Sequence, residues 1–235
     1  MDITKHKTNL TNILIDIYKD SYFAGKLGFK GGTAAMLFYN LPRFSVDLDF
    51  DYIGEKSKIN ETITKITEIV SKKYTIKDQS TKFNTLFWLL SYEKGEHNIK
   101  LEISTRDNSY NHYQTKVFYG VGIKVIDISD MIAHKMVAFS ERPSLANRDL
   151  FDIHYLLGTE YASSINYEVI KKRTGKNPIE FYKLILKLIE TVKPDKILEG
   201  LGEVLTDSQK DWAKAKLLIE VKNLIQRQID LIQAE

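Results

Sequence analysis

The stretch that decides the fold is 30–50, which reads KGGTAAMLFYNLPRFSVDLDF. It opens with Gly31 and Gly32, continues into apolar residues at helical spacing, and ends in alternating apolar and acidic residues. The helical spacing predicts a helix with Thr33 as its N-cap, and the alternation predicts a strand. The sequence therefore predicts a glycine turn, a short helix and an acidic strand in direct succession.

Two aspartates, Asp47 and Asp49, lie two residues apart in the expected strand. Side chains two apart leave the same face of a sheet, where two carboxylates repel each other unless a cation lies between them. Hard divalent ions such as Mg²⁺ prefer carboxylate oxygens, and two ions about 4 Å apart can hold a triphosphate and activate a hydroxyl. Glu102, in another expected strand, is the candidate third acid, whereas Asp51 is expected at the rim.

The pair Gly31 and Gly32 adds a possible phosphate site to these acids. Glycines at the start of a helix leave backbone N–H groups open to phosphate oxygens. An Asp-x-Asp pair alone is more often the solvated face of an edge strand. The glycine pair together with the further acid favours metal-assisted phosphate chemistry.

The composition sets the broad class of the protein. The chain has 235 residues, 43% of them hydrophobic, with 34 basic and 31 acidic residues and no cysteine. These values indicate a globular protein and exclude disulfides, cysteine-ligated zinc, iron–sulfur clusters and thiol catalysis. No apolar run approaches the ~18 residues of a membrane span and no secretory leader is evident, so we expect a cytoplasmic protein.

Apolar periodicity changes near residue 128, with mixed patterns before this point and helical spacing after it. We expect an α+β fold with two domains: an α/β core over 1–128 and a helical domain over 129–235 that completes the active-site cleft. The expected helices are 10–18, 33–41, 58–72, 129–140, 148–157, 164–173, 178–192 and 211–233, and the expected strands are 46–50, 83–92, 97–105 and 117–127, the middle two forming a hairpin.

Four motifs in order resemble the AbiEii/AbiGii (AbiE-type, MenT-like) nucleotidyltransferase toxins. They are the block at 30–50, Glu102 in its strand, 130–135 (DMIAHK) and 148–157 (RDLFDIHYLL), and the resemblance covers about 28–158. It implies a nucleotidyltransferase-like, polymerase-β-like mixed sheet with helices, followed by a helical C-terminal part.

The resemblance also implies roles for individual residues. It gives a catalytic set of Asp47, Asp49, Glu102, Lys135 and Asp152, of which the first three bind metal. It gives a nucleotide-binding set of Gly31, Gly32, Thr33, Ser45, Lys135 and Arg148. Arg148 and Asp152 are four residues apart and share a helix face, so an ordinary helical ion pair is the alternative for these two.

The implied activity is transfer of a nucleoside monophosphate from an NTP to an acceptor hydroxyl, with two Mg²⁺ ions. The resemblance further suggests the toxin of a type IV-like toxin–antitoxin or phage-defence pair, with tRNA 3′ ends as acceptor and a separate antitoxin protein. Two alternatives stay open: transfer to a protein target by the same fold, and a catalytically idle RNA-binding module.

A basic segment over 171–196 holds eight basic and three acidic residues, a net charge of +5 against +3 for the whole chain. A solvated helix face is the usual explanation for such a run. Phe181 and Tyr182 within it would allow RNA bases to stack. The candidate RNA-binding residues are Lys171, Lys172, Arg173, Lys176, Lys183 and Lys187.

Overall fold

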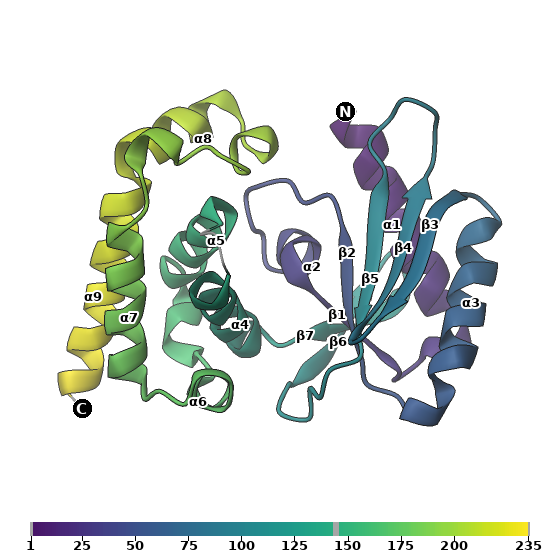
Figure 1. The fold of residues 1–235 in the computed structure, drawn as a ribbon, viewed down its shortest axis with the longest axis horizontal. Helices are drawn as coiled ribbons and strands as arrows, with labels where there is room; N and C mark the ends of the chain where they lie inside the picture. The colour runs from purple at the N-terminus through teal and green to yellow at the C-terminus, as the bar shows by residue number, and fades with distance from the viewer. Residues whose placement is uncertain (1, 143–145, 235) are drawn as a thin grey trace. The chain divides into compact units, whose positions relative to one another are not determined.

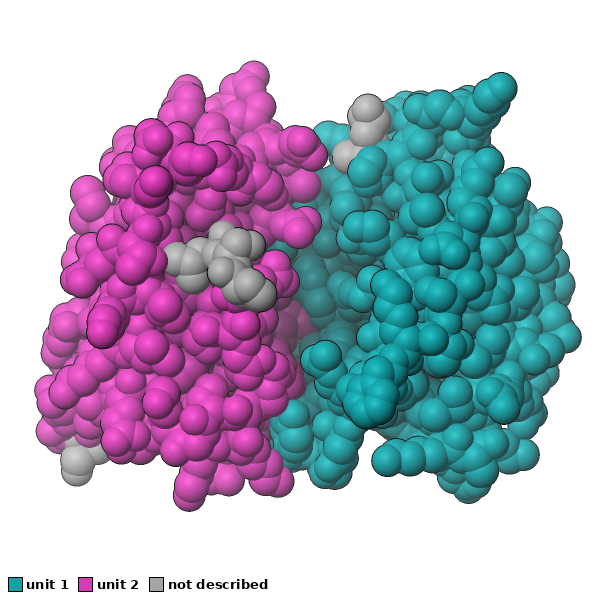
Figure 2. Space-filling view, viewed as in Figure 1, with its two compact units in different colours: residues 1–127 teal, residues 128–235 magenta. Residues whose placement is uncertain are grey.

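The computed structural model describes residues 2–142 and 146–234. The chain forms two compact units, 1–127 and 128–235, which Figure 2 shows in two colours. The first unit is built on one β-sheet, and the second is helical in the residues that the structure describes. The predicted α+β class, with a helical part following a mixed sheet, is confirmed.

The sheet of the first unit has seven strands in the order β3-β4-β5-β2-β1-β7-β6. Its two parallel pairs are β2 with β5 and β1 with β7, and the other neighbours are antiparallel. The strands are β1 (Leu27–Lys30), β2 (Leu48–Tyr52), β3 (Thr75–Lys82), β4 (Thr85–Ser91), β5 (Ile99–Ser104), β6 (Tyr113–Phe118) and β7 (Val121–Ile126). The parallel pairing of β2 and β5 brings Asp49 of β2 beside Glu102 of β5.

Three helices accompany this sheet: α1 (Ile3–Lys19), α2 (Gly31–Phe38) and α3 (Ile59–Ser71), with 3₁₀ turns at Ser21–Phe23 and Lys56–Lys58 (Figure 1). Helix α1 packs on the sheet. Its Tyr18 ring lies 6.4 Å from the Phe50 ring, and the Tyr18 hydroxyl donates to the Leu27 carbonyl at 2.9 Å. Leu48 and Phe50 are fully buried. Burial of the apolar side chains of β2 fixes which face of the strand carries the acids.

Some predicted boundaries in this unit are wrong. Helix α2 starts at Gly31, so Thr33 is a buried residue inside the helix and Lys30 occupies the N-cap position. The expected strand 117–127 is two strands, β6 and β7, joined at Tyr119 and Gly120, which both have positive φ. Successive positive φ values give the tight hairpin turn that a single long strand lacks. The hairpin of β4 and β5 is confirmed.

The second unit consists of α4 (Ile128–Glu141), α5 (Asn147–Leu157), α6 (Tyr167–Thr174), α7 (Pro178–Glu190), α8 (Asp207–Trp212) and α9 (Leu218–Ala234), with 3₁₀ turns at Glu160–Ser164, Pro194–Lys196 and Gly202–Val204. A π-helical turn, Ala213–Leu217, joins α8 to α9. The helix expected over 211–233 therefore starts earlier, at Asp207, and contains a change of pitch. Within 2–142 and 146–234, no helix is long and apolar enough to span a bilayer.

Candidate active site

The acids of the first unit meet across two neighbouring strands. In the parallel pairing of β2 with β5, Asp49 lies opposite Glu102. Residues paired across strands project to the same face, so these two carboxylates lie on one side of the sheet. Asp47 stands one residue before β2. The strand register thus places two of the three predicted acids, Asp49 and Glu102, side by side, and Asp47 directly precedes β2.

The glycine turn lies directly against these acids. Gly31 has φ +79°, and a Cβ added to it would come 2.9 Å from both Cβ and Cγ of Asp49. A Cβ added to Gly32 would come 2.8 Å from the Ser45 hydroxyl and 3.0 Å from the Arg43 guanidinium. Only glycines allow the backbone to turn here at this distance. The N-terminus of α2 therefore lies beside Asp49 and Ser45, where the sequence predicted a phosphate-binding turn.

Two hydrogen bonds hold the chain on either side of Asp47. The Thr33 hydroxyl, inside α2, donates to the Asp47 carbonyl. His6 Nε2, on α1, donates to the Val46 carbonyl at 3.0 Å, and the Tyr92 hydroxyl donates to His6 Nδ1 at 3.1 Å. Thr33 was predicted to bind nucleotide, and the structure shows its hydroxyl bonded to the backbone of the acidic segment.

Sequence reasoning missed His6 and Arg43. His6 is fully buried, and burial lowers its pKa, so the neutral ring with Nε2–H fits its two hydrogen bonds. It lies four residues before Leu10 on the apolar face of α1, a spacing that could have identified it. Arg43 is buried as well and donates to the Phe44 carbonyl at 2.9 Å, next to Gly32.

The fit of a divalent metal can be tested on these side chains. Asp47 Oδ1 is buried and accepts no hydrogen bond from any described residue, which leaves a carboxylate oxygen in need of a cation. Among the described residues, no three His, Asp or Glu side chains converge into one ligand group. Mg²⁺ is commonly held by one or two carboxylates together with waters and substrate phosphates. Asp47 and Asp49 beside the glycine turn fit that mode of binding, and Glu102 stays a predicted third ligand.

Asp51, expected at the rim, is instead fully buried. Lys30 Nζ lies 2.5 Å from its Oδ1, while the Tyr113 hydroxyl and the Asn111 amide donate to Oδ2 at 2.9 and 3.2 Å. The expectation is wrong because Gly28, opposite Asp51 in β1, leaves room for the Tyr113 ring to cover the carboxylate. Asp51 is a neutralised structural acid that belongs to the sheet.

The second unit holds a separate cluster of charges on α4 and α5. Lys135 Nζ lies 2.7 Å from Asp152 Oδ2 and 3.7 Å from Asp149 Oδ1, and its side chain is only 14% exposed. Arg142 Nε lies 3.2 Å from Asp149 Oδ2. Both aspartates are buried, so the two cations neutralise two desolvated carboxylates. Lys135 and Asp152, predicted to act together, are in direct contact.

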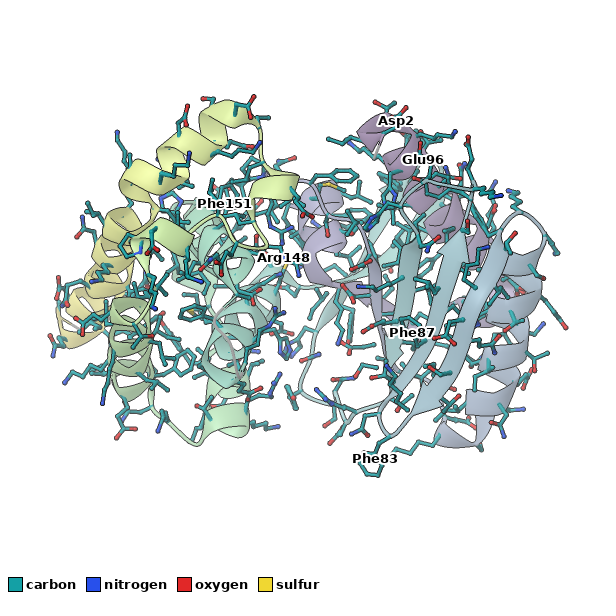
Figure 3. All side chains as sticks on the ribbon, turned by 45° about the horizontal axis from the view of Figure 1, so that its top comes forward. Asp2, Phe83, Phe87, Glu96, Arg148 and Phe151 are labelled. Carbon is teal, nitrogen blue, oxygen red and sulfur yellow. The ribbon has the colours of Figure 1, made fainter. Side chains whose placement is uncertain are left out.

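Arg148 differs from Lys135. Figure 3 labels it on α5 together with Phe151, whose side chain is buried. The side chain of Arg148 is partly exposed and forms no ion pair with any residue of 2–142 or 146–234, so the alternative of a helical pair with Asp152 is not realised. The Arg148 guanidinium is therefore without an acidic partner in the part of the chain that the structure describes.

The basic segment of α6 and α7 is mostly solvated. Lys171, Lys172, Lys183 and Lys187 are exposed and Lys176 is partly so, whereas Arg173 is paired with Glu141. The stacking expectation is wrong, because Phe181 and Tyr182 are fully buried and the Tyr182 hydroxyl bonds that of Tyr167 at 3.1 Å. Both rings fill the core of the helical unit, so only the lysines stay available to RNA phosphates.

Comparisons with known proteins agree with this arrangement. A candidate nucleotidyltransferase from H. pylori matches with a TM-score of 0.63 and 19% identity, covering 98% of this chain and 96% of its own. JHP933 from Helicobacter pylori matches at 0.56 and 18%, covering 99% and 97%. An antigenic nucleotidyltransferase-like protein from Paracoccidioides brasiliensis matches at 0.53 and 14%, covering 86% and 96%. At these identities the likeness shows a nucleotidyltransferase-like fold.

No curated protein matches this chain significantly in sequence. The family described as "Nucleotidyl transferase AbiEii toxin, Type IV TA system" matches residues 13–222. This match extends well beyond the 28–158 range of the motifs and includes most of the helical unit. The chain therefore belongs to the AbiEii family of nucleotidyltransferase toxins.

Proposed function

We propose that this protein transfers a nucleoside monophosphate from an NTP to the 3′-terminal hydroxyl of an RNA, with tRNA as the favoured acceptor. The observation that carries the proposal is the combination at the start of β2. An unpartnered carboxylate oxygen of Asp47 calls for a cation, and the N-terminus of α2 beside Asp49 offers N–H groups to an anion. A cation site and an anion site side by side suit a metal–triphosphate substrate.

In the proposed reaction the acceptor oxygen bonds to the α-phosphorus, the bond from that phosphorus to the bridging oxygen breaks, and pyrophosphate leaves with the electron pair. Mg²⁺, when bound, supplies charge neutralisation and lowers the pKa of the attacking hydroxyl. Asp47 and Asp49 hold the cation, and Glu102, opposite Asp49, orients the hydroxyl and takes its proton. The backbone of Gly31 and Gly32 binds phosphate oxygens.

We propose from family membership that the helical unit contributes Lys135 and Arg148 as phosphate contacts. Arg148 forms no ion pair with a described residue and so keeps its guanidinium for a phosphate. Lys135, already bound to Asp152, is a phosphate contact whose position that carboxylate fixes. Family membership implies a cognate antitoxin, and we propose that it is a separate protein which suppresses this activity.

The test incubates the full chain with Mg²⁺, total RNA and each α-³²P-labelled NTP in turn. We expect label to enter RNA of tRNA size with at least one NTP, and Asp47→Asn to abolish the labelling. The Asp78→Asn variant is the matched control, since Asp78 is an exposed aspartate on β3 of the same sheet. Label in a protein band would point to a protein target. RNA binding with no label in any product would overturn the proposed nucleotidyltransferase activity.

A further inference from the structure

A pocket of about 370 Å³ lies at the far end of β2 from Asp47, away from the glycine turn. Its size falls within the range of small-molecule sites in proteins. Its walls come from the end of β2, the loop after β5 and the start of β6. Prominent lining residues are Tyr52, Lys56, Arg106, Asn108, Asn111 and Tyr113.

The pocket adjoins the acidic face. Asp51 lies two residues, or about 6.6 Å, beyond Asp49 on the same face of β2. Tyr113 and Asn111, which both line the pocket, donate to the Asp51 carboxylate. The buried ion pair of Asp51 with Lys30 thus forms a rigid partition between this pocket and the acids.

Both aromatic rings that line the pocket pack against glycines. A Cβ on Gly28 would lie 2.6 Å from Tyr113 Cδ1, and a Cβ on Gly54 would lie 2.8 Å from the Tyr52 hydroxyl. At both glycine positions, the side chain of any other residue would occupy the space that the ring fills. The Tyr52 hydroxyl is further held by the Glu55 carbonyl at 2.7 Å. Both rings are therefore fixed in place before any ligand binds, and the partly exposed Tyr113 is the ring that a base can reach, since Tyr52 is buried.

The chemistry of the lining suits one ligand class. Aromatic rings stack on the faces of nucleobases, side-chain amides bond to base edges, and exposed cations attract the adjoining phosphates. Asn108 and Asn111 supply the amides, and Lys56 and Arg106 are exposed cations at the mouth. We propose that this pocket binds the nucleoside portion of a nucleotide taking part in transfer, an inference that rests on the proposed function. Two sources share this chemistry: the incoming NTP and the terminal nucleotide of the acceptor RNA.

Binding is tested without activity by NMR on the full chain labelled with ¹⁵N-asparagine. AMP, CMP, GMP and UMP are titrated separately, followed by inorganic triphosphate. We expect at least one nucleoside monophosphate to shift the side-chain amide signals of Asn108 and Asn111, and inorganic triphosphate to leave them unchanged. If no monophosphate moves these signals at millimolar concentration, or triphosphate alone moves them, the assignment is overturned.

Variants then separate a stacking role from a structural one. Tyr113→Leu removes the ring and should weaken monophosphate binding at least about fivefold, whereas Tyr113→Phe keeps the ring and should bind within about twofold of wild type. If Tyr113→Leu fails to fold, Arg106→Ala is the alternative test. Arg106 is exposed, and its replacement should weaken monophosphate binding. Lys77→Ala, an exposed lysine of β3, is the control and should have no effect. Equal affinities for Tyr113→Leu and wild type would contradict the proposal.

Steady-state kinetics identify the source of the nucleoside. A raised KM for the NTP in Tyr113→Leu and Arg106→Ala assigns the pocket to the incoming nucleotide, and a raised KM for RNA alone assigns it to the acceptor. If the wild type labels RNA and neither KM moves, the pocket assignment fails and the proposed transferase stands. If the wild type labels nothing while monophosphates still shift Asn108 and Asn111, the pocket stands and the proposed reaction fails.

Discussion

Asp47 in the first unit and the aspartates of α5 in the second unit differ in how their carboxylates are compensated. Asp47, one residue before β2, keeps a buried oxygen that accepts no hydrogen bond from any described residue. On α5 of the second unit, Asp149 and Asp152 lie within ion-pair distance of Lys135 and Arg142. A buried charge without a partner costs stability, and removing one partner of a buried pair creates such a charge.

This difference separates an acid with no ion pair among the described residues from acids that have one. We propose that the acids of the first unit bind a cation, so loss of their charge should harm activity and spare the fold. The acids of the second unit already hold their cations, and loss of their charge should harm the fold.

The largest effect is expected for Asp47→Asn. The variant keeps the shape of the side chain and removes the charge that we propose binds the cation, so transfer should fall on the order of 10²- to 10³-fold. Thermal stability without metal should be unchanged or higher, because an uncompensated buried charge is gone. Activity with labelled NTP and differential scanning calorimetry measure the two effects. Retention of more than a tenth of the activity would place the essential charge elsewhere.

The next effect is on stability, in Asp152→Asn. Breaking the shorter buried ion pair leaves Lys135 with only its 3.7 Å contact to Asp149 and should cost about 3 kcal/mol of unfolding free energy. Urea unfolding in a Trp88→Phe background reports on the helical unit through Trp212, which lies 5.9 Å from the Phe151 ring. Asp211→Asn, an exposed aspartate of α8, is the control.

A double variant tests whether the loss in Asp152→Asn comes from charge imbalance. Lys135→Met with Asp152→Leu removes both charges and keeps apolar volume, so it should recover most of the lost stability. It should also stay inactive, because Lys135 and Asp152 are both assigned to catalysis. A stable and active double variant would show that the cluster serves the fold alone.

Much of the site was predictable because its signals are local. The alternation of Asp47 and Asp49 with apolar residues is visible within five residues, and the apolar face of β5 gives the orientation of Glu102. The contacts that hold the site are different in kind. His6 with Val46, and Lys30 with Asp51, join residues 40 and 21 positions apart, and no periodicity reports such pairs.

Sequence reasoning missed β1, and it missed β3 and most of β6 at the two edges of the sheet. β3 and β6 stand at opposite ends of the strand order, and most of their side chains are at least partly exposed. An edge strand with little buried surface lacks the alternation of apolar and polar residues that identifies a strand. The central strands β2 and β5 were recognised because burial of their apolar side chains produces that pattern. The central strand β1 has only four residues, which is too short to show it.

A smaller effect is expected for Gly31→Ala, which isolates the contact between the glycine turn and Asp49. A positive φ alone costs about 1–2 kcal/mol for alanine. Gly25 has φ +78° with open space around it, against φ +79° at Gly31, so Gly25→Ala measures the backbone cost alone. Gly31→Ala should cost more stability than Gly25→Ala and lose activity, because its Cβ displaces the Asp49 carboxylate. Equal stability losses in Gly31→Ala and Gly25→Ala, with full activity in Gly31→Ala, would contradict the close approach of Gly31 to Asp49.

The smallest effect is the pH dependence contributed by His6. Burial lowers its pKa below 6.5, opposed by the bond to Val46 and by the charges of Asp47 and Glu96, while His97 lowers it further. The unfolded chain therefore binds one more proton as the pH falls below 6.5, and stability should decline there by at most about 1.4 kcal/mol per pH unit.

His6→Gln removes this titration and keeps an amide that can donate to the Val46 carbonyl. Its unfolding free energy, followed through Trp88 in a Trp212→Phe background, should decline less than that of the matched parent between pH 7 and pH 5. His97→Gln is the control for the exposed neighbouring histidine and should keep most of the decline. If His6→Gln and its parent decline in parallel, His6 is not the group that links pH to the stability of the segment before Asp47, and the acids themselves become the candidates.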